Sequence, residues 1–246
     1  MPRFGRMAVV PALLIAASIV AGCEGEPTTS NTKVGTLELV SGDDQSGSAG
    51  LLLGQHLVVR ILDQYGRPAA GEPVFFELDA ASLAKGASVD PVVDTTGADG
   101  IASTQLRLGA STGTYRLEAI WPGLELFEQG QTLRPFQTVE FVATAGPAPP
   151  ATLTILSGDD QTGAVDSLLP QALTVEVTDA FGNPVPGVTV TFAVASGGGQ
   201  VSTTAATTNS SGVATTSWTL GPSVGAQSVV AFVAGLQPVT FDATAQ

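Results

Sequence analysis

Two pairs of adjacent aspartates are the first residues in this sequence with the chemistry of a binding site. Asp43-Asp44 and Asp159-Asp160 each follow Ser-Gly and precede Gln, in segments 116 residues apart. Carboxylate oxygens are the ligands that Ca²⁺ prefers, but the ion takes about six to eight oxygens. Each pair supplies too few, and solvated aspartates are also typical of turns. A weak calcium site and a turn therefore remain two interpretations of each pair, and no other metal site is expected.

Two Gly-x-Ser-x-Gly segments carry the next candidate chemistry, with Ser111 and Ser223 at their centres. In α/β-hydrolases this spacing places a nucleophilic serine between a strand and a helix. Here strand-like patterns lie on both sides, and His56, the only histidine, would have to serve as the base for either serine. His56 alone is also a poor metal site. We therefore expect turns here, with no catalytic residue and no cofactor.

Cys23, the only cysteine, ends an apolar N-terminal run, Ala8 to Gly22. The run has 15 residues, whereas a transmembrane helix needs roughly 20. Its ending, Val-Ala-Gly-Cys, resembles the bacterial lipobox, which implies cleavage before Cys23 and a lipid on its thiol. Several acyl chains there would hold the protein on a membrane. The alternative is an ordinary secretory leader with a cysteine present by chance.

The net charge of −13 argues against nucleic acid as a partner, because an acidic chain repels phosphate backbones. From Ala151 onward the sequence has no Lys or Arg. A basic docking patch is therefore excluded in that half of the chain.

A long internal repeat positions these residues. Leu57 to Phe76 (LVVRILDQYGRPAAGEPVFF) and Leu173 to Phe192 (LTVEVTDAFGNPVPGVTVTF) lie 116 residues apart. In each, alternating apolar residues flank a turn that contains Asp, Gly and Pro, and this period of two predicts strands with one buried face. The repeat predicts that one fold is built twice.

Each copy contains about seven short strand patterns separated by Gly, Pro, Asp and Asn. This arrangement predicts an all-β chain of two tandem Ig-like β-sandwich domains. The Pro-rich segment between them is expected to be extended and to hold the domains apart semi-rigidly. The predicted parts are a leader at 1–22, a tether at 23–33, domain 1 at 34–145 with an insert at 125–136, a linker at 146–151 and domain 2 at 152–246.

The second copy, LTVEVTDAFGNPVPGVTVTF followed by TTNSSGVATTSWTLGPSVGAQSVVAFVAG, resembles the bacterial Ig-like domains of invasin and intimin. The resemblance implies an extracellular sandwich used as a stalk or adhesive module, with no catalytic residues. Because no cysteine pair exists, the core must rest on packing, with Trp218 as a candidate plug. Tyr115 is a candidate tyrosine corner, although Gln227 stands at its repeat position.

The insert carries Leu126, Phe127, Leu133 and Phe136, and domain 2 has no counterpart to it. Apolar residues displayed on a loop predict a recognition surface. The alternative is that they extend two strands and fold back onto the sandwich. Ig topology places the insert at the end where the chain enters domain 1. It places the loop Ser157 to Pro170 and the turn Gly221 to Gly225 at the far end of domain 2.

The leading hypothesis is a non-catalytic surface lipoprotein that acts as a stalk or adhesion module, held on a membrane through Cys23. We expect it in the cell envelope, at the outer membrane or cell surface rather than the inner membrane. The alternative is a module that binds a glycan or protein ligand through the insert or the distal loops of domain 2.

The lipid anchor makes a direct prediction. Cys23→Ser removes the thiol that would carry the lipid, so the variant should leave the membrane fraction and appear in the soluble fraction. The measurement is fractionation followed by immunoblotting. Unchanged fractionation of the variant would contradict the lipobox interpretation.

Overall fold

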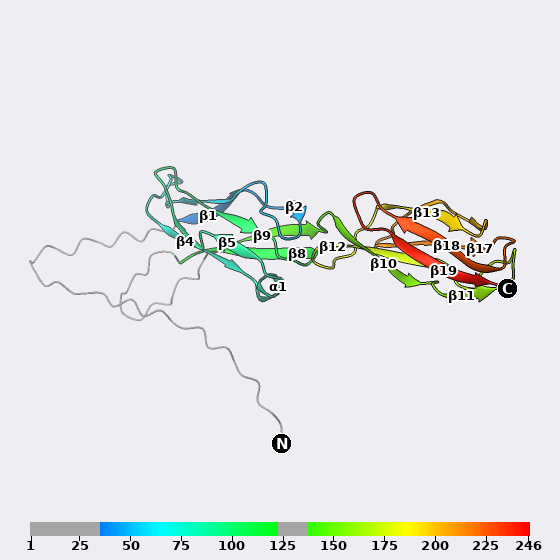
Figure 1. Cartoon of the computed structure of the whole chain (residues 1–246). Helices are drawn as coiled ribbons and strands as arrows, with labels where there is room; N and C mark the ends of the chain where they lie inside the picture. The colour runs from blue at the N-terminus through cyan, green and yellow to red at the C-terminus, as the bar shows by residue number, and fades with distance from the viewer. Residues whose placement is uncertain (1–34, 123–136) are drawn as a thin grey trace, which may run out of the picture. The chain divides into compact units, whose positions relative to one another are not determined.

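The computed structural model describes residues 35–122 and 137–246, which form two tandem Ig-like β-sandwiches (Figure 1). The first contains strands β1 to β9, drawn blue to green, and the second contains β10 to β19, drawn green to red. All the described residues fall in one compact unit. The all-β prediction is confirmed. In this described part, no helix is long and apolar enough to cross a membrane.

The first sandwich packs a four-stranded sheet, ordered β1-β3-β7-β5, against a five-stranded sheet, ordered β2-β9-β8-β4-β6. Neighbouring strands are antiparallel, except that β2 runs parallel to β9. The strands are β1 (Thr36–Ser41), β2 (Gln45–Ser48), β3 (Leu57–Leu62), β4 (Pro73–Leu78), β5 (Ser88–Asp90), β6 (Val93–Thr95), β7 (Ile101–Arg107), β8 (Gly113–Trp121) and β9 (Gln137–Gly146).

The second sandwich repeats this arrangement with sheets ordered β10-β12-β16 and β11-β19-β18-β13-β15, together with a short β14-β17 pair. Here β11 runs parallel to β19, as β2 does to β9. The strands are β10 (Pro150–Ser157), β11 (Gln161–Gly163), β12 (Leu173–Asp179), β13 (Thr189–Ser196), β14 (Gln200–Val201), β15 (Ala205–Thr207), β16 (Val213–Thr216), β17 (Trp218–Thr219), β18 (Gly225–Phe232) and β19 (Val239–Ala245).

The Ser-Gly-Asp-Asp-Gln segments carry the chain from one sheet to the other. In the first sandwich β1 belongs to one sheet and β2 to the other, and Asp44 between them has a left-handed φ of 55°. The Gln45 side chain then donates to the carbonyls of Gly42 and Gln55 and accepts the Gln55 N–H. In the second sandwich Asp160 has the same φ, and Gln161 makes the corresponding bonds to Gly158 and Gln171.

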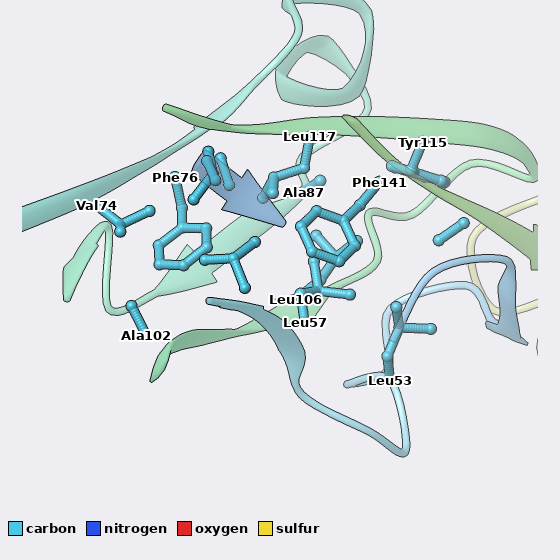
Figure 2. Close-up of a cluster of buried hydrophobic side chains, with 14 of the residues drawn as sticks. Leu53, Leu57, Val74, Phe76, Ala87, Ala102, Leu106, Tyr115, Leu117 and Phe141 are labelled. Carbon is cyan, nitrogen blue, oxygen red and sulfur yellow. The ribbon is translucent and has the colours of Figure 1, made fainter. Parts of the chain in front are cut away.

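Each sandwich buries one continuous apolar core, drawn from the inward positions of alternating strands. Figure 2 shows Phe76 and Phe141 in the first core, with Leu57, Leu106 and Leu117 among their neighbours. In the second core, Phe192 and Phe241 pack with ring centroids 6.5 Å apart, and Trp218 is fully buried. The predicted role of Trp218 in filling that core agrees with this burial.

Tyr115 is a buried tyrosine whose hydroxyl donates to the Ser111 carbonyl, and burial raises its pKa above the ordinary value. At the repeat position, the Gln227 side chain donates to the Ser223 carbonyl 2.8 Å away. A hydrogen bond to the serine carbonyl four residues earlier is therefore made by a phenol in the first sandwich and by an amide in the second.

Two features depart from the sequence analysis. Strand β9 continues to Gly146 and β10 begins at Pro150, so strands occupy part of the predicted linker at 146–151. A short helix, α1 (Ala80–Ala84), was also missed; the Asp79 side chain caps it by accepting the Ser82 N–H. A helix of one turn leaves no periodic pattern to detect.

The cores predict the effect of matched phenylalanine substitutions. Phe241 on β19 is 0% exposed, whereas Phe232 on β18 is 42% exposed. Phe241→Ala should lower the free energy of unfolding by about 3–5 kcal/mol, because it leaves a cavity. Phe232→Ala should change it by about 0.5 kcal/mol or less. Urea denaturation measures both, and equal effects would contradict this assignment of the core.

Candidate binding surfaces

The aspartate pairs have structural roles. Asp43 accepts the N–H of Val142 at 2.8 Å, and Asp159 accepts the N–H of Asp242 at 2.8 Å, so each ties the sheet switch to the last strand of its sandwich. Within residues 35–122 and 137–246, no group of three or more His, Cys, Asp or Glu side chains is placed to hold a metal. The geometry therefore favours the turn interpretation of these residues over the calcium interpretation.

The two Gly-x-Ser-x-Gly segments are turns that lead into strands. The first precedes β8 and the second precedes β18, so neither serine stands before a helix. The backbone carbonyls of Ser111 and Ser223 are the acceptors for Tyr115 and Gln227. These turns anchor the sandwiches, and they lack the strand-to-helix geometry of a hydrolase nucleophile.

Cys23 and the predicted binding residues Leu126, Phe127, Leu133 and Phe136 lie outside the described residues. Trp121 and Gln137, close to either side of the insert, are described. Gln137 donates its side-chain amide to the Gly35 carbonyl at 2.6 Å, and the Trp121 ring lies against Gly35. Both flanks of the insert therefore meet the first sandwich at the end where the chain enters it.

The loop 164–170 is hydrogen-bonded to residues 218–221, which lead into the turn Gly221 to Gly225, at the far end of the second sandwich. Leu169 donates its N–H to the Trp218 carbonyl, and Leu220 donates to the Ser167 carbonyl, both at 2.9 Å. Leu168 is 64% exposed and Val224 is 76% exposed. We call these two segments the distal loops; they display two apolar side chains to solvent.

An apolar groove of about 360 Å³ lies on the first sandwich beside the edge strand β6. It is lined by Phe75, Phe76, Glu77, Leu78, Leu83, Val92 and Val93. Phe75, Leu83, Val92 and Val93 are exposed. The residue at the repeat position of Phe75 is Thr191, so the second sandwich has no aromatic ring at this position.

The repeated turns after β3 and β12 use the same aspartate differently. Asp63 accepts the N–H groups of Tyr65 and Arg67 and pairs with the Arg67 guanidinium at 2.8 Å. Asp179 likewise accepts the N–H groups of Phe181 and Asn183. It also accepts the Asn183 side-chain amide at 2.9 Å.

Asp179 has a further partner in the segment between the sandwiches, because it accepts the Ala148 N–H at 2.8 Å. Burial raises the pKa of the Asp179 carboxyl, but hydrogen bonds from the Asn183 side chain and from the N–H groups of Ala148, Asn183 and Phe181 outweigh it. They hold its pKa below the ordinary value of 3.8. The ionised carboxylate is therefore the form that organises this turn.

Asp179 consequently predicts a pH dependence of stability. A folded-state pKa below the unfolded one means that ionised Asp179 stabilises the fold above the ordinary pKa and loses this effect as pH falls through the folded-state pKa. Asp179→Asn should lower the free energy of unfolding by about 1–3 kcal/mol at neutral pH, because it replaces an acceptor oxygen with a donor. The difference should shrink as pH is lowered below 3.8. A difference that stays constant in denaturation series from neutral to acid pH would contradict this role.

Comparison with known proteins finds a family model that matches most of the second sandwich. Residues 156–245 match the model of the bacterial Ig-like domain, group 1. No curated protein matches the chain. Among solved structures, the Escherichia coli adhesin FdeC is 21% identical with a TM-score of 0.49, covering 87% of this chain and 65% of its own length.

Two further structures are similar at comparable identity. The D00-D0 domain of intimin is 18% identical with a TM-score of 0.43, covering 85% of this chain and 97% of its own. Invasin, a bacterial integrin-binding protein, is 20% identical with a TM-score of 0.37, covering 87% of this chain and 40% of its own. The family match confirms, for residues 156–245, the bacterial Ig-like sandwich that the turn and the later strands of the sequence predicted.

Proposed function

We propose that this chain is a non-catalytic surface lipoprotein whose tandem Ig-like sandwiches act as a stalk or adhesion module. The observation that carries the proposal is the match of residues 156–245, in the second sandwich, to the bacterial Ig-like domain. The first sandwich, which precedes it in the chain, has a similar arrangement of strands. A module of this kind works through the surface it presents.

The residues with catalytic potential support a non-catalytic role. Ser111 and Ser223 lie in turns whose carbonyls anchor buried side chains, and His56 is exposed. Among the described residues, neither serine hydroxyl pairs with His56. In the part of the chain that the structure describes, His56 therefore does not serve as a base for either serine.

The anchor and the location are part of the proposal. A lipid on Cys23 would hold the sandwiches at the cell envelope, with the outer membrane or cell surface favoured. Residues 24–33 would serve as a tether of at most about 35 Å, at roughly 3.5 Å per residue.

A second candidate function is capture of a protein or glycan ligand through the distal loops. Its support is the pair of exposed apolar residues Leu168 and Val224 on hydrogen-bonded neighbouring segments. Exposed apolar side chains on loops held by a rigid scaffold are a common arrangement for binding. The insert is a weaker candidate, since its flanks lie at the end where the chain enters the first sandwich.

The two functions differ in which substitutions matter. For an adhesion module that does not use the insert, deletion of residues 125–136 should leave attachment of expressing cells to coated surfaces unchanged, while loss of the whole chain should reduce it. Attachment counts on protein- and glycan-coated plates measure this. Attachment that is the same with and without the chain would overturn the adhesion proposal. Loss of attachment on deleting only the insert would assign binding to the insert.

Ligand capture by the distal loops predicts a different result. Leu168→Ser with Val224→Ser should abolish ligand capture in a glycan array and a pull-down, while the fold is retained. The matched control is Leu156→Ser, which changes an exposed leucine on β10. Equal capture by the control and the double variant would contradict a site at the distal loops.

A further inference from the structure

Asn183 is the residue through which the turn after β12 contacts the first sandwich. Its side-chain amide donates to the Ala110 carbonyl at 2.7 Å, and its side-chain oxygen accepts the Thr112 N–H at 3.3 Å. One carboxamide therefore meets a donor and an acceptor of the same turn, the one that leads into β8. Such a two-point contact specifies orientation as well as proximity.

Hydrogen bonds to the Asp179 carboxylate hold Asn183 in position. The carboxylate accepts both the backbone and the side-chain N–H of Asn183, and it also accepts the Ala148 N–H. Asp179 is 2% exposed, so these bonds are sheltered from competing water. The connecting segment, the turn and the amide are consequently held by a single carboxylate.

Phe181, in the same turn, supplies a second contact. Its ring lies against Gly50, where an added Cβ would stand 2.6 Å from the ring Cζ atom. Gly50 has φ of 78° and donates its N–H to the Gly109 carbonyl, which places it beside the turn that Asn183 contacts. The absence of a side chain at residue 50 is therefore a requirement for seating the ring.

The other copy of each element shows what the contact demands. Asp166 is the counterpart of Gly50: its φ is 54°, and its N–H points to the Gly221 carbonyl as that of Gly50 points to Gly109. A side chain at this position would occupy the place of the ring. In the turn after β3, Arg67 replaces Asn183 and pairs with Asp63 of its own turn. Among the described residues, the glycine that receives the ring therefore occurs only in the first sandwich, and the asparagine that makes the amide contact occurs only in the turn of the second.

We propose that the Asn183 amide and the Phe181 ring, seated on Ala110, Thr112 and Gly50, lock the two sandwiches into one rigid body, and that a glycine at position 50 is the determinant of this fit. This proposal is an alternative to the extended, semi-rigid linker that the sequence predicts. The inference is independent of the proposed function, because it concerns only the joint.

The test measures the distance between the sandwiches in solution. Spin labels on Glu118→Cys and Thr240→Cys, both exposed, report one position on each sandwich. Residues 33–246 contain both complete cores and no native cysteine, so the labels are unique. A locked joint gives a single narrow distance distribution in pulsed electron paramagnetic resonance. A broad distribution in the parent protein would overturn the proposal.

The decisive variant is Gly50→Asp, which introduces the residue that the second sandwich carries at the same turn position. It should broaden the distribution, and Asn183→Ala should do the same. Adding Phe181→Ala to Gly50→Asp should narrow the distribution again, because the clash is removed while the amide contact remains. Arg67→Ala, at the equivalent turn of the first sandwich, is the matched control and should have no effect. Circular dichroism checks that every variant is folded, and distributions that stay narrow in both Gly50→Asp and Asn183→Ala would refute the lock.

Discussion

Each sandwich depends on the crossing of the chain from one sheet, at β1 or β10, to the other sheet, at β2 or β11. The Ser-Gly-Asp-Asp-Gln segment makes this transfer through a left-handed aspartate and a glutamine that bonds to two backbone segments. The preceding aspartate, Asp43 or Asp159, reaches the last strand and ties it to the switch. Because β2 then pairs with β9, and β11 with β19, the chain contributes to both layers and encloses one core between them. The aspartate pairs, which in the sequence resemble a metal site, therefore have the structural role of connecting the two sheets.

The differences between the two copies carry more functional information than their similarities. The residue at the repeat position of Val188 is Glu72, a buried carboxylate that accepts the Trp121 indole N–H in the first sandwich. Asn183 stands where the first copy has Arg67, and Asp166 stands where it has Gly50. Each of these changes alters what one end of a sandwich can contact while the strands around it stay the same. Duplication thus preserves the core and leaves the ends of the sandwiches free to diverge.

A local sequence motif predicts a role only together with its structural context. Gly-x-Ser-x-Gly predicts a nucleophile only before a helix, and here both copies lead into strands. The part of each serine that has a structural role is its backbone carbonyl oxygen, which accepts a hydrogen bond from Tyr115 or Gln227 and which the motif does not describe. The repeat itself indicated this in the sequence. A motif that occurs at the same position of both copies is more simply explained by a structural role that both copies share than by a catalytic site.

The sequence by itself determined the fold class, the two-fold repeat and most of the strands, because period-two alternation and turn residues act locally. The core residues Phe192 and Phe241 follow from the same alternation. Only the tertiary structure decided what the turn after β12 contacts. Asn183 and Phe181 meet Ala110 and Gly50, which lie far away in the chain, and no local pattern encodes a contact between segments brought together by folding.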